Sequence, residues 1–197
     1  MNTLGPGYFD DLYADSPDPW GFASRWYERR KYALSLAMLP REHYRDAFEP
    51  GCSIGIFTAL LAARCDRLLA CDTSAEAVRR ARLRAPEATI EQRMIPAQWP
   101  AGTFDLIVFS EILYYLGDAD LAQALELGTG SLRPGGTLLA VHWRHPVADY
   151  PRTGDDVHAA LARTRLSRLA RHIEADFTAE VYVNGVAVSV ATAEGLT

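Results

Sequence analysis

The segment Ala47-Phe48-Glu49-Pro50-Gly51-Cys52-Ser53-Ile54-Gly55-Ile56-Phe57-Thr58 decides the fold of this chain. It begins as a short apolar run, passes through an acid and a glycine-containing turn, and continues into a helix-forming segment at residues 59–63. A second apolar run at residues 68–71 ends at Asp72. Strand, glycine turn, helix, strand and terminal acid form the first half of a nucleotide-binding βαβ unit. The sequence therefore predicts a nucleotide site where these two strands end.

The spacing within the turn discriminates between nucleotides. A dinucleotide fingerprint has glycine at its first, third and sixth positions, which here are Gly51, Ser53 and Ile56. Two of the three glycines are missing, which weakens the case for a nicotinamide-dependent oxidoreductase. Glu49 precedes Gly51 by two residues, and Gly55 supplies a further glycine, as in the acid-x-Gly-x-Gly-x-Gly pattern of S-adenosylmethionine binders with Ser53 in place of the middle glycine. The carboxylate of Glu49 can meet an ammonium group, whereas it would repel a phosphate.

Length and composition favour one domain that covers residues 1–197, with 49% hydrophobic residues for a sizeable core. The 20 basic and 25 acidic residues give a formal charge of −5, which disfavours a nucleic-acid partner.

No apolar run is long enough to cross a bilayer, and residues 1–6 do not resemble a signal peptide. The three cysteines and five histidines are not clustered, so we expect no metal and a cytoplasmic location. The sequence is compatible with a monomer and with a homodimer.

Residues 1–46 precede the nucleotide unit and are rich in aromatic side chains. A turn is predicted at residues 16–21 and a helix at residues 23–39, stopped by Pro40. A helix before the first strand cannot belong to the sheet. We expect it to cover the sheet's C-terminal edge as a lid or to pack against its side as additional core.

Strands and helices alternate after Asp72. Helices are predicted at residues 74–85, capped by Ser74, and 118–127, and strands at 89–94, 104–109 and 137–142. This alternation implies a parallel sheet covered on both faces. Further on, the sequence predicts a helix at 155–165, strands at 168–174 and 177–183, and a hairpin in which Asn184-Gly185 leads into a strand at 186–190.

Four blocks of the chain resemble class I S-adenosylmethionine-dependent methyltransferases: Glu49-x-Gly51-x-x-x-Gly55, Leu69-Ala70-Cys71-Asp72, Phe104-Asp105-Leu106-Ile107 and Leu132-Arg133-Pro134-Gly135-Gly136. Other segments are similar to the nodulation protein S type of methyltransferase: Tyr8-Phe9-Asp10-Asp11-Leu12-Tyr13, Asp18-Pro19-Trp20, Tyr27-Glu28-Arg29-Arg30-Lys31-Tyr32, Ser110-Glu111-Ile112-Leu113-Tyr114-Tyr115-Leu116 and His142-Trp143-Arg144-His145-Pro146. The resemblance covers residues 8 to about 183, and the tail from Asn184 has no counterpart in it.

This resemblance implies a Rossmann-like α/β fold with a mostly parallel seven-stranded sheet of order 3-2-1-4-5-7-6, the last strand antiparallel, and helices on both faces. Residues 1–46 would form an N-terminal helical lid, and residues 47–197 the core with its C-terminal β-hairpin. The resemblance also implies S-adenosyl-L-methionine as cofactor and S-adenosyl-L-homocysteine as product. Nodulation protein S methylates the amino nitrogen of a deacetylated chitooligosaccharide, but such sheets host many acceptors, so the acceptor has to be argued from the site.

The donor site is expected around the glycine turn. Gly51 and Gly55 would let the backbone approach the methionyl moiety, and Asp72 would accept hydrogen bonds from the ribose diol. Asp72 can alternatively start the next helix as a cap. Flanking positions complete the predicted donor set: Glu49, Ser53, Thr73 and Ser110.

Two further regions are predicted to reach the donor. Ala97 and Gln98 would contact adenine, while the neighbouring Trp99 either stacks on the base or closes the core. In the lid, Trp20 would cover the ligand and Arg30 would meet its carboxylate. Arg29 and Lys31 compete with Arg30 for this role, and a solvated basic helix face is the alternative for all three.

The acceptor site is expected at the ends of the fourth and fifth strands. Glu111 is predicted to position an ammonium acceptor or take its proton, with a solvated carboxylate or helix cap as the alternative. His142 and His145 are candidate bases, although histidines on such loops are more often structural. The predicted substrate-binding residues are Tyr114, Tyr115, Trp143 and His158.

The sequence thus predicts a methyltransferase that uses S-adenosylmethionine and N-methylates an amino sugar or another small-molecule amine. An O-methyltransferase would differ only in its acceptor and would depend more on a histidine base. A catalytically silent module that binds the donor is the remaining alternative.

Overall fold

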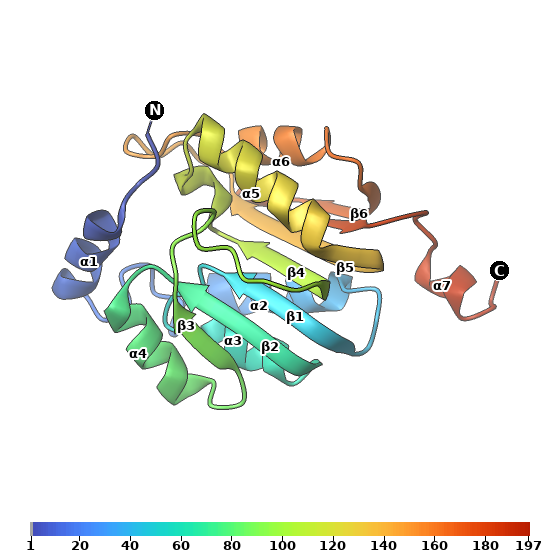
Figure 1. Cartoon of the computed structure of the whole chain (residues 1–197), viewed down its shortest axis with the longest axis horizontal. Helices are drawn as coiled ribbons and strands as arrows, with labels where there is room; N and C mark the ends of the chain where they lie inside the picture. Colours follow the sequence, from blue (N-terminus) through green and yellow to red (C-terminus); the bar gives the residue numbers. More distant parts are fainter. Residues whose placement is uncertain (1) are drawn as a thin grey trace.

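The computed structural model describes residues 2–197 and contains one seven-stranded sheet (Figure 1). The strand order is β3-β2-β1-β4-β5-β7-β6, and every neighbouring pair is parallel except those that involve β7. The strands are β1 (Tyr44–Pro50), β2 (Cys65–Asp72), β3 (Thr89–Gln92), β4 (Phe104–Ser110), β5 (Leu132–Trp143), β6 (Ser167–Ile173) and β7 (Phe177–Val183). This order and the antiparallel last strand confirm the predicted fold.

Helices lie on both faces of the sheet, as predicted (Figure 1). They are α1 (Pro6–Asp15), α2 (Trp26–Met38), α3 (Ile56–Ala62), α4 (Ala75–Arg84), α5 (Asp118–Ser131), α6 (Gly154–Leu161) and α7 (Val190–Ala193), with a 3₁₀ turn, η1, at Leu113–Tyr115. Figure 1 shows α5 in front of β4 and β5, with α2 and α3 behind the sheet. No helix among residues 2–197 combines the length and the apolar character needed to span a membrane.

The two faces of β4 explain this layering. Leu106 and Val108 pack with residues of α2 and α3, whereas Ile107 and Phe109 pack with residues of α5 and α6. All four side chains are fully buried, and successive side chains of a strand point to opposite faces. A strand buried on both faces is the pattern of a parallel sheet covered on both sides.

The N-terminal region divides its two expected roles between two helices. Tyr32 and Leu39, in and just after α2, belong to the core behind the sheet, so this helix is additional core. Tyr13 of α1 instead packs with Ile54 and Trp20 above the glycine turn. The predicted lid is therefore formed by α1 and the segments around it rather than by the longer helix.

The predicted hairpin at Asn184-Gly185 is wrong. The hairpin is formed by β6 and β7, which pair antiparallel, and residues 186–189 are not in a strand. β7 pairs with β5 on one side and β6 on the other, so both its hydrogen-bonding edges are occupied. The tail leaves the sheet, Val186 is 83% exposed, and α7 stands apart at the C-terminus (Figure 1).

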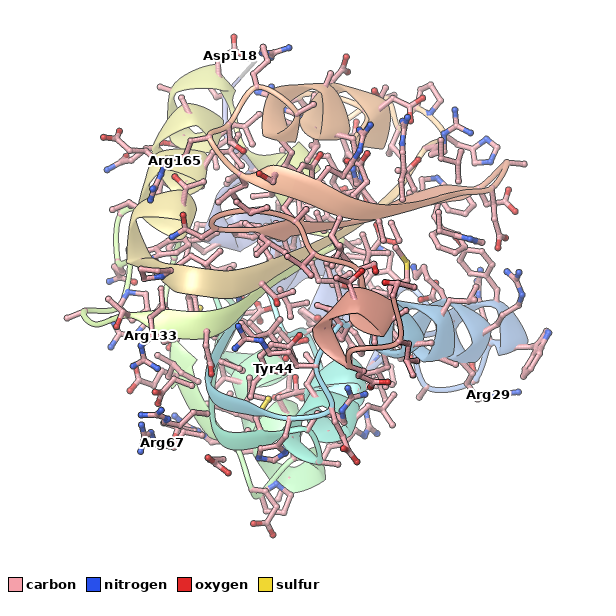
Figure 2. The ribbon with its side chains drawn as sticks, turned by 90° about the vertical axis from the view of Figure 1, so that its right-hand side faces the viewer. Arg29, Tyr44, Arg67, Asp118, Arg133 and Arg165 are labelled. Carbon is pink, nitrogen blue, oxygen red and sulfur yellow. The ribbon has the colours of Figure 1, made fainter. Side chains whose placement is uncertain are left out.

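The N-terminal edge of the sheet is fastened by ion pairs. Asp46 of β1 pairs with Arg67 of β2 at 2.5 Å and with Arg133 at the start of β5 at 2.7 Å. Figure 2 shows Arg67 and Arg133 on the same side of the molecule. The opposite edge, where the parallel strands end, carries the pocket described next.

Candidate active site

A pocket lies where β1, β2 and β4 end. It has a glycine-loop half (Glu49, Gly51, Ser53, Asp72 and Thr73) and a β4 half (Ser110, Glu111, Ile112 and Tyr115). The rest of its wall comes from the N-terminal region, the glycine turn, α3, the end of β2, the segment after β3 and the residue after η1: Thr3, Leu4, Phe9, Tyr13, Trp20, Phe22, Tyr32, Cys52, Ile56, Phe57, Cys71, Arg93, Met94, Ile95 and Leu116. Ligands of open α/β sheets bind in this crevice outside the strand ends.

The glycine turn brings backbone close to the pocket wall. Gly51 has a φ of +74°, and a Cβ there would lie 2.4 Å from Cδ1 of Ile112. Its N–H donates to the carbonyl of Cys71 at 2.7 Å, which fastens the turn to β2. A side chain at position 51 would therefore collide with the β4 half of the pocket, while the approach of this glycine to a methionyl moiety stays a prediction.

Gly55 has a different reason to be glycine. It precedes α3 with a φ of +79°, and a Cβ there would lie 2.8 Å from the Cα of Ala81 in α4. This glycine lets two helices pack closely and does not line the pocket. Its predicted contact with the ligand is not supported by this placement.

Asp72 links the two strands that frame the glycine-loop half. One carboxylate oxygen accepts the N–H of Ser53 at 2.9 Å, and the other accepts the N–H of Ser74 at 3.0 Å. Each oxygen has a second lone pair, so both can accept another hydrogen bond from a ligand. The predicted cap role is also partly met, because Asp72 accepts a backbone N–H where α4 begins. Burial raises the pKa of Asp72, although the backbone donors oppose this shift.

Glu49 is a buried acid with an unpartnered oxygen. Its side chain is 2% exposed, and Oε2 has no hydrogen-bond partner among the residues that the structure describes. Burial, with a smaller contribution from Asp72, raises the pKa of Glu49 to about 8. A buried polar atom without a partner is costly, so this carboxyl group is suited to a ligand that supplies hydrogen-bond donors.

The aromatic cover is fastened to the glycine turn. The hydroxyl of Tyr13 in α1 lies 2.5 Å from Oγ of Ser53, whose φ is +49°. Trp20 packs edge-on against Tyr13 and stacks on Phe22, and all three rings line the pocket. Trp20 is therefore placed where the sequence predicts it.

Three other predicted donor contacts lie outside the pocket. Arg30 makes two hydrogen bonds to Glu174, at 2.6 and 2.7 Å, and its pKa is raised mainly by this partner. Ala97 and Gln98 are also absent from the wall. Gln98 instead accepts the N–H of Met94 at 2.8 Å and shapes the loop, so that residues 93–95 reach the pocket. Trp99 packs on Phe48, so of its two predicted roles it closes the core.

Glu111 stands at a strained corner after β4. Its φ is +56°, which is unusual for a residue with a side chain. Oε2 accepts the hydroxyl of Tyr114 at 2.7 Å and the N–H of Trp143 at 2.8 Å, while Oε1 lies 2.5 Å from Nζ of Lys31. The carboxylate is 8% exposed and lines the pocket, as predicted. Strain of this kind is typical of functional sites.

Of the other predicted acceptor residues, Tyr115 lines the pocket, whereas Tyr114 and Trp143 lie behind its wall and contact Glu111 from there. Lys31 of α2 is a residue whose role the sequence did not identify. In the sequence it is only a competitor of Arg30, because a lysine that follows two arginines in a helix gives no indication that it is buried.

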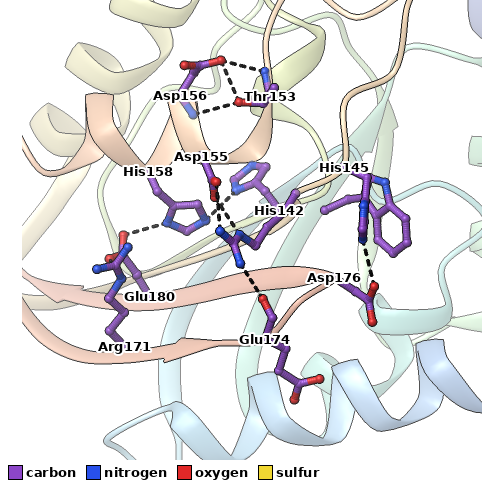
Figure 3. A network of polar contacts seen from close by, with 12 residues as sticks. His142, His145, Thr153, Asp155, Asp156, His158, Arg171, Glu174, Asp176 and Glu180 are labelled. Atoms are coloured by element: carbon purple, nitrogen blue, oxygen red, sulfur yellow. Dashed lines mark hydrogen bonds and ion pairs between the residues drawn. The ribbon is translucent and has the colours of Figure 1, made fainter.

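His142 and His158 form a buried chain away from the pocket (Figure 3). The N–H of Leu113 donates to Nε2 of His142 at 3.4 Å, so the proton of the neutral ring is on Nδ1, which faces Nε2 of His158 at 3.3 Å. Nδ1 of His158 then donates to Glu180 at 2.7 Å. Burial lowers the pKa of His142 well below its usual value. Both nitrogens of His142 are occupied, so its predicted role as a base is not supported.

His145 is half exposed and lies 2.9 Å from Asp176, outside the pocket (Figure 3). It too is not placed to act as a base on a ligand in the pocket. No group of three or more histidine, cysteine, aspartate or glutamate residues within 2–197 is arranged to hold a metal ion.

A family model described as Nodulation protein S (NodS) matches residues 10–183. The chain belongs to the NodS family. The observed sheet has the strand order expected for the class I S-adenosylmethionine-dependent methyltransferase fold. This confirms the resemblance found in the sequence.

Individual relatives agree with this assignment. The chain is 39% identical to nodulation protein S of Rhizobium tropici over 137 residues, which cover 66% of this chain and 56% of that protein. The match thus spans little more than half of that relative. Among solved structures, NodS N-methyltransferase from Bradyrhizobium japonicum WM9 in complex with S-adenosyl-l-homocysteine has a TM-score of 0.82 at 26% identity, covering 92% of this chain and 99% of that one. A methyltransferase structure from Pseudomonas syringae has a TM-score of 0.72 at 51% identity, covering 81% and 99%.

Proposed function

We propose that this protein transfers a methyl group from S-adenosylmethionine to the amino nitrogen of a small acceptor, with an amino sugar as the acceptor class. The observation that carries the proposal is the unpartnered carboxyl oxygen of Glu49 beside the glycine turn. The donor's amino acid end carries an ammonium group, which is the partner that this oxygen lacks.

The rest of the glycine-loop half fits the same donor. The free lone pairs of Asp72 can accept the two hydroxyls of a ribose, and Gly51 leaves space for the methionyl chain. Bound there, the donor supplies an electrophilic methyl group for in-line displacement by a lone pair of the acceptor. The protein's part is to hold the two molecules in line and to exclude water, which is an orientation effect.

The charge of the pocket favours a cationic acceptor. Among the described residues, its wall contains the carboxyl groups of Asp72 and Glu111, a third at Glu49 that ionises with a pKa of about 8, and one basic side chain, Arg93. A crevice lined mainly by one sign of charge raises the local concentration of ligands of the opposite sign. An amine that arrives as an ammonium ion suits this field, whereas an anionic acceptor does not.

An oxygen acceptor is less consistent with the site. Methylation of a hydroxyl requires a base near the reacting oxygen. His142 and His145, the predicted histidine bases, both lie outside the pocket, and the carboxylate of Glu111, which lines it, takes a proton far more readily from an ammonium ion than from a hydroxyl. The solved relative from Bradyrhizobium is named an N-methyltransferase, which supports nitrogen for this chain.

The test has two stages. Calorimetry with S-adenosylhomocysteine, with NAD⁺ as the control, measures donor binding, and we expect binding of the first compound only. Labelled S-adenosylmethionine is then incubated with glucosamine and with glucose, which differ in the group at one carbon. We expect label on glucosamine alone. Label on glucose would favour oxygen transfer, and donor binding without any labelled acceptor would favour a silent module.

A further inference from the structure

A buried group of three charges lies directly behind the β4 half of the pocket. Nζ of Lys31 is 2.5 Å from Oε1 of Glu111 and 3.0 Å from Oε2 of Glu28, and all three side chains are almost fully buried. Two carboxylates and one ammonium leave this group one negative charge in surplus. Burying a charge in surplus is costly, so the arrangement requires a reason.

The geometry of Glu111 leaves one route open to a ligand. Oε2 already accepts two hydrogen bonds, from Tyr114 and Trp143, whereas Oε1 contacts only Lys31 among the described residues. Oε1 therefore has a free lone pair, and Glu111 lines the pocket. An acceptor ammonium in the pocket can donate to this oxygen while Lys31 stays on its inner side.

The inner end of the group, at Glu28, also has an oxygen that is available for a hydrogen bond. Oε2 of Glu28 has no hydrogen-bond partner among residues 2–197, although Lys31 is near enough to form an ion pair with it. Glu28 lies in the first turn of α2, beside the exposed Arg25. Burial raises the pKa of Glu28, even though Lys31 opposes the shift. At Lys31 the balance is reversed: burial lowers the pKa, but the two carboxylates outweigh it and the pKa is raised.

We propose that Glu111, Lys31 and Glu28 form a relay that takes the proton of an acceptor ammonium out of the pocket before methyl transfer. This inference rests on the proposed function. The N–H bond of the ammonium breaks as an O–H bond forms on Glu111. Lys31 receives that proton while giving one of its own to Glu28, so that Glu111 and Lys31 regain their charges and Glu28 ends protonated.

The proton balance of the reaction is consistent with this path. A neutral amine has the lone pair that displaces the donor's sulfur, and the methylated amine leaves as a cation. One proton per turnover is thus released, and it leaves Glu28 for water after the product departs. Uptake of the proton turns the group of three from net negative to neutral, which removes the buried surplus charge.

Groups from several elements surround the relay and set its electrostatics. The neighbouring titratable and charged side chains are Arg25, Tyr27 and Tyr32 from α2 and its start, Tyr114 from η1, His142 from β5 and Glu49 from β1. The ring of Tyr27 also lies under Lys31, with Nζ 5.1 Å from its centroid. Burial keeps the tyrosines protonated and His142 neutral. Glu49 ionises with a pKa of about 8, but it does so in the wild type and in a Glu28 variant alike, so a comparison of the two isolates the relay.

The test is a pH profile of Glu28→Gln with glucosamine as acceptor. This variant keeps the Lys31–Glu111 pair and removes only the final proton site. We expect kcat/KM to fall at least about tenfold at pH values where glucosamine is an ammonium ion, and to return to the wild-type value where glucosamine is already neutral. Glu28→Asp is expected to restore part of the loss, and Glu87→Gln, an exposed change of the same kind, is the control.

A second measurement does not depend on turnover. Infrared difference spectra of the complex with S-adenosylhomocysteine, recorded on addition of glucosamine, are expected to show a new protonated carboxyl band that Glu28→Gln lacks. A loss of activity that is equal at all pH values, or no loss at all, would overturn the relay. Wild-type protein that labels no amine would overturn the proposed function itself, and calorimetry with S-adenosylhomocysteine shows whether either variant still folds and binds.

Discussion

The two halves of the pocket are built in different ways. The glycine-loop half comes from residues 49–53 and 72–73, which one βαβ unit brings together. The β4 half depends on Glu111, whose carboxylate is held by Lys31 from α2 and by Trp143 from the end of β5. The first is encoded in a short stretch of sequence, whereas the second exists only when distant segments have packed. Changes in the first are therefore expected to act on donor binding, and changes around the second on stability or acceptor chemistry.

The largest effect is expected for Asp72→Ala. It removes the two acceptors of the ribose hydroxyls and also leaves the N–H groups of Ser53 and Ser74 without their partner. Hydrogen bonds to a charged group contribute roughly 1.5–3 kcal/mol each, so affinity for S-adenosylhomocysteine is expected to fall on the order of 10²-fold or more. Calorimetry measures this, with Asp66→Ala at the other end of β2 as the control. Unchanged affinity would show that the glycine-loop half does not bind a ribose.

Glu49→Gln tests the same half through pH. Free protein holds the proton of Glu49 up to a pKa of about 8, whereas an ordinary glutamate releases it near 4.5. The free energy of unfolding is therefore expected to fall as pH rises through this interval, by up to about 1.4 kcal/mol per pH unit. Affinity for S-adenosylhomocysteine is expected to rise over the same interval as Glu49 ionises. Urea unfolding and calorimetry across pH measure both trends, and the variant is expected to lose both.

His142→Gln tests whether His142, which lies behind the β4 half, has a structural or a catalytic role. The change disrupts the hydrogen-bonded chain to His158 and Glu180, and we expect a loss of about 1–3 kcal/mol in the free energy of unfolding. Donor affinity is expected to stay at the wild-type value, because His142 does not line the pocket. Full stability combined with lost methyl transfer would instead make His142 a catalytic base.

The smallest effect is expected for Arg30→Ala. This side chain pairs with Glu174 at the surface, so affinity for S-adenosylhomocysteine is expected to match that of the wild type. The same calorimetric titration measures it. A marked loss of affinity would show that Arg30 leaves Glu174 to bind the donor and would return the residue to the pocket.

The resemblance to class I methyltransferases implied the sheet order, whereas local patterns predicted most of the strands and helices and most of the glycine-loop half. Strand periodicity, Gly51, Glu49 and Asp72 all lie within one short unit, so their spacing along the chain is close to their spacing in space. Gly55 was a partial exception. A glycine is required at this position because α4 approaches it closely, and no local pattern in the sequence reveals that contact.

Errors came where a residue has competing partners. Asn184-Gly185 is a good hairpin turn, but both edges of β7 are paired, so the tail cannot form a hairpin with this strand. Arg30, His145 and His158 have suitable chemistry, but they pair with Glu174, Asp176 and Glu180 instead of lining the pocket. The burial of Lys31 was not predicted, because it depends on Glu111, which lies 80 residues away in the sequence.

The amino-acid sequence by itself determined the order of strands and helices and the glycine turn with its two acids, because hydrophobic period and backbone freedom are local properties. Only the tertiary structure decided which polar side chains reach the pocket and which pair with each other. A charged group is drawn to the nearest opposite charge or hydrogen-bond partner in space, and that neighbour is fixed by packing rather than by position in the chain.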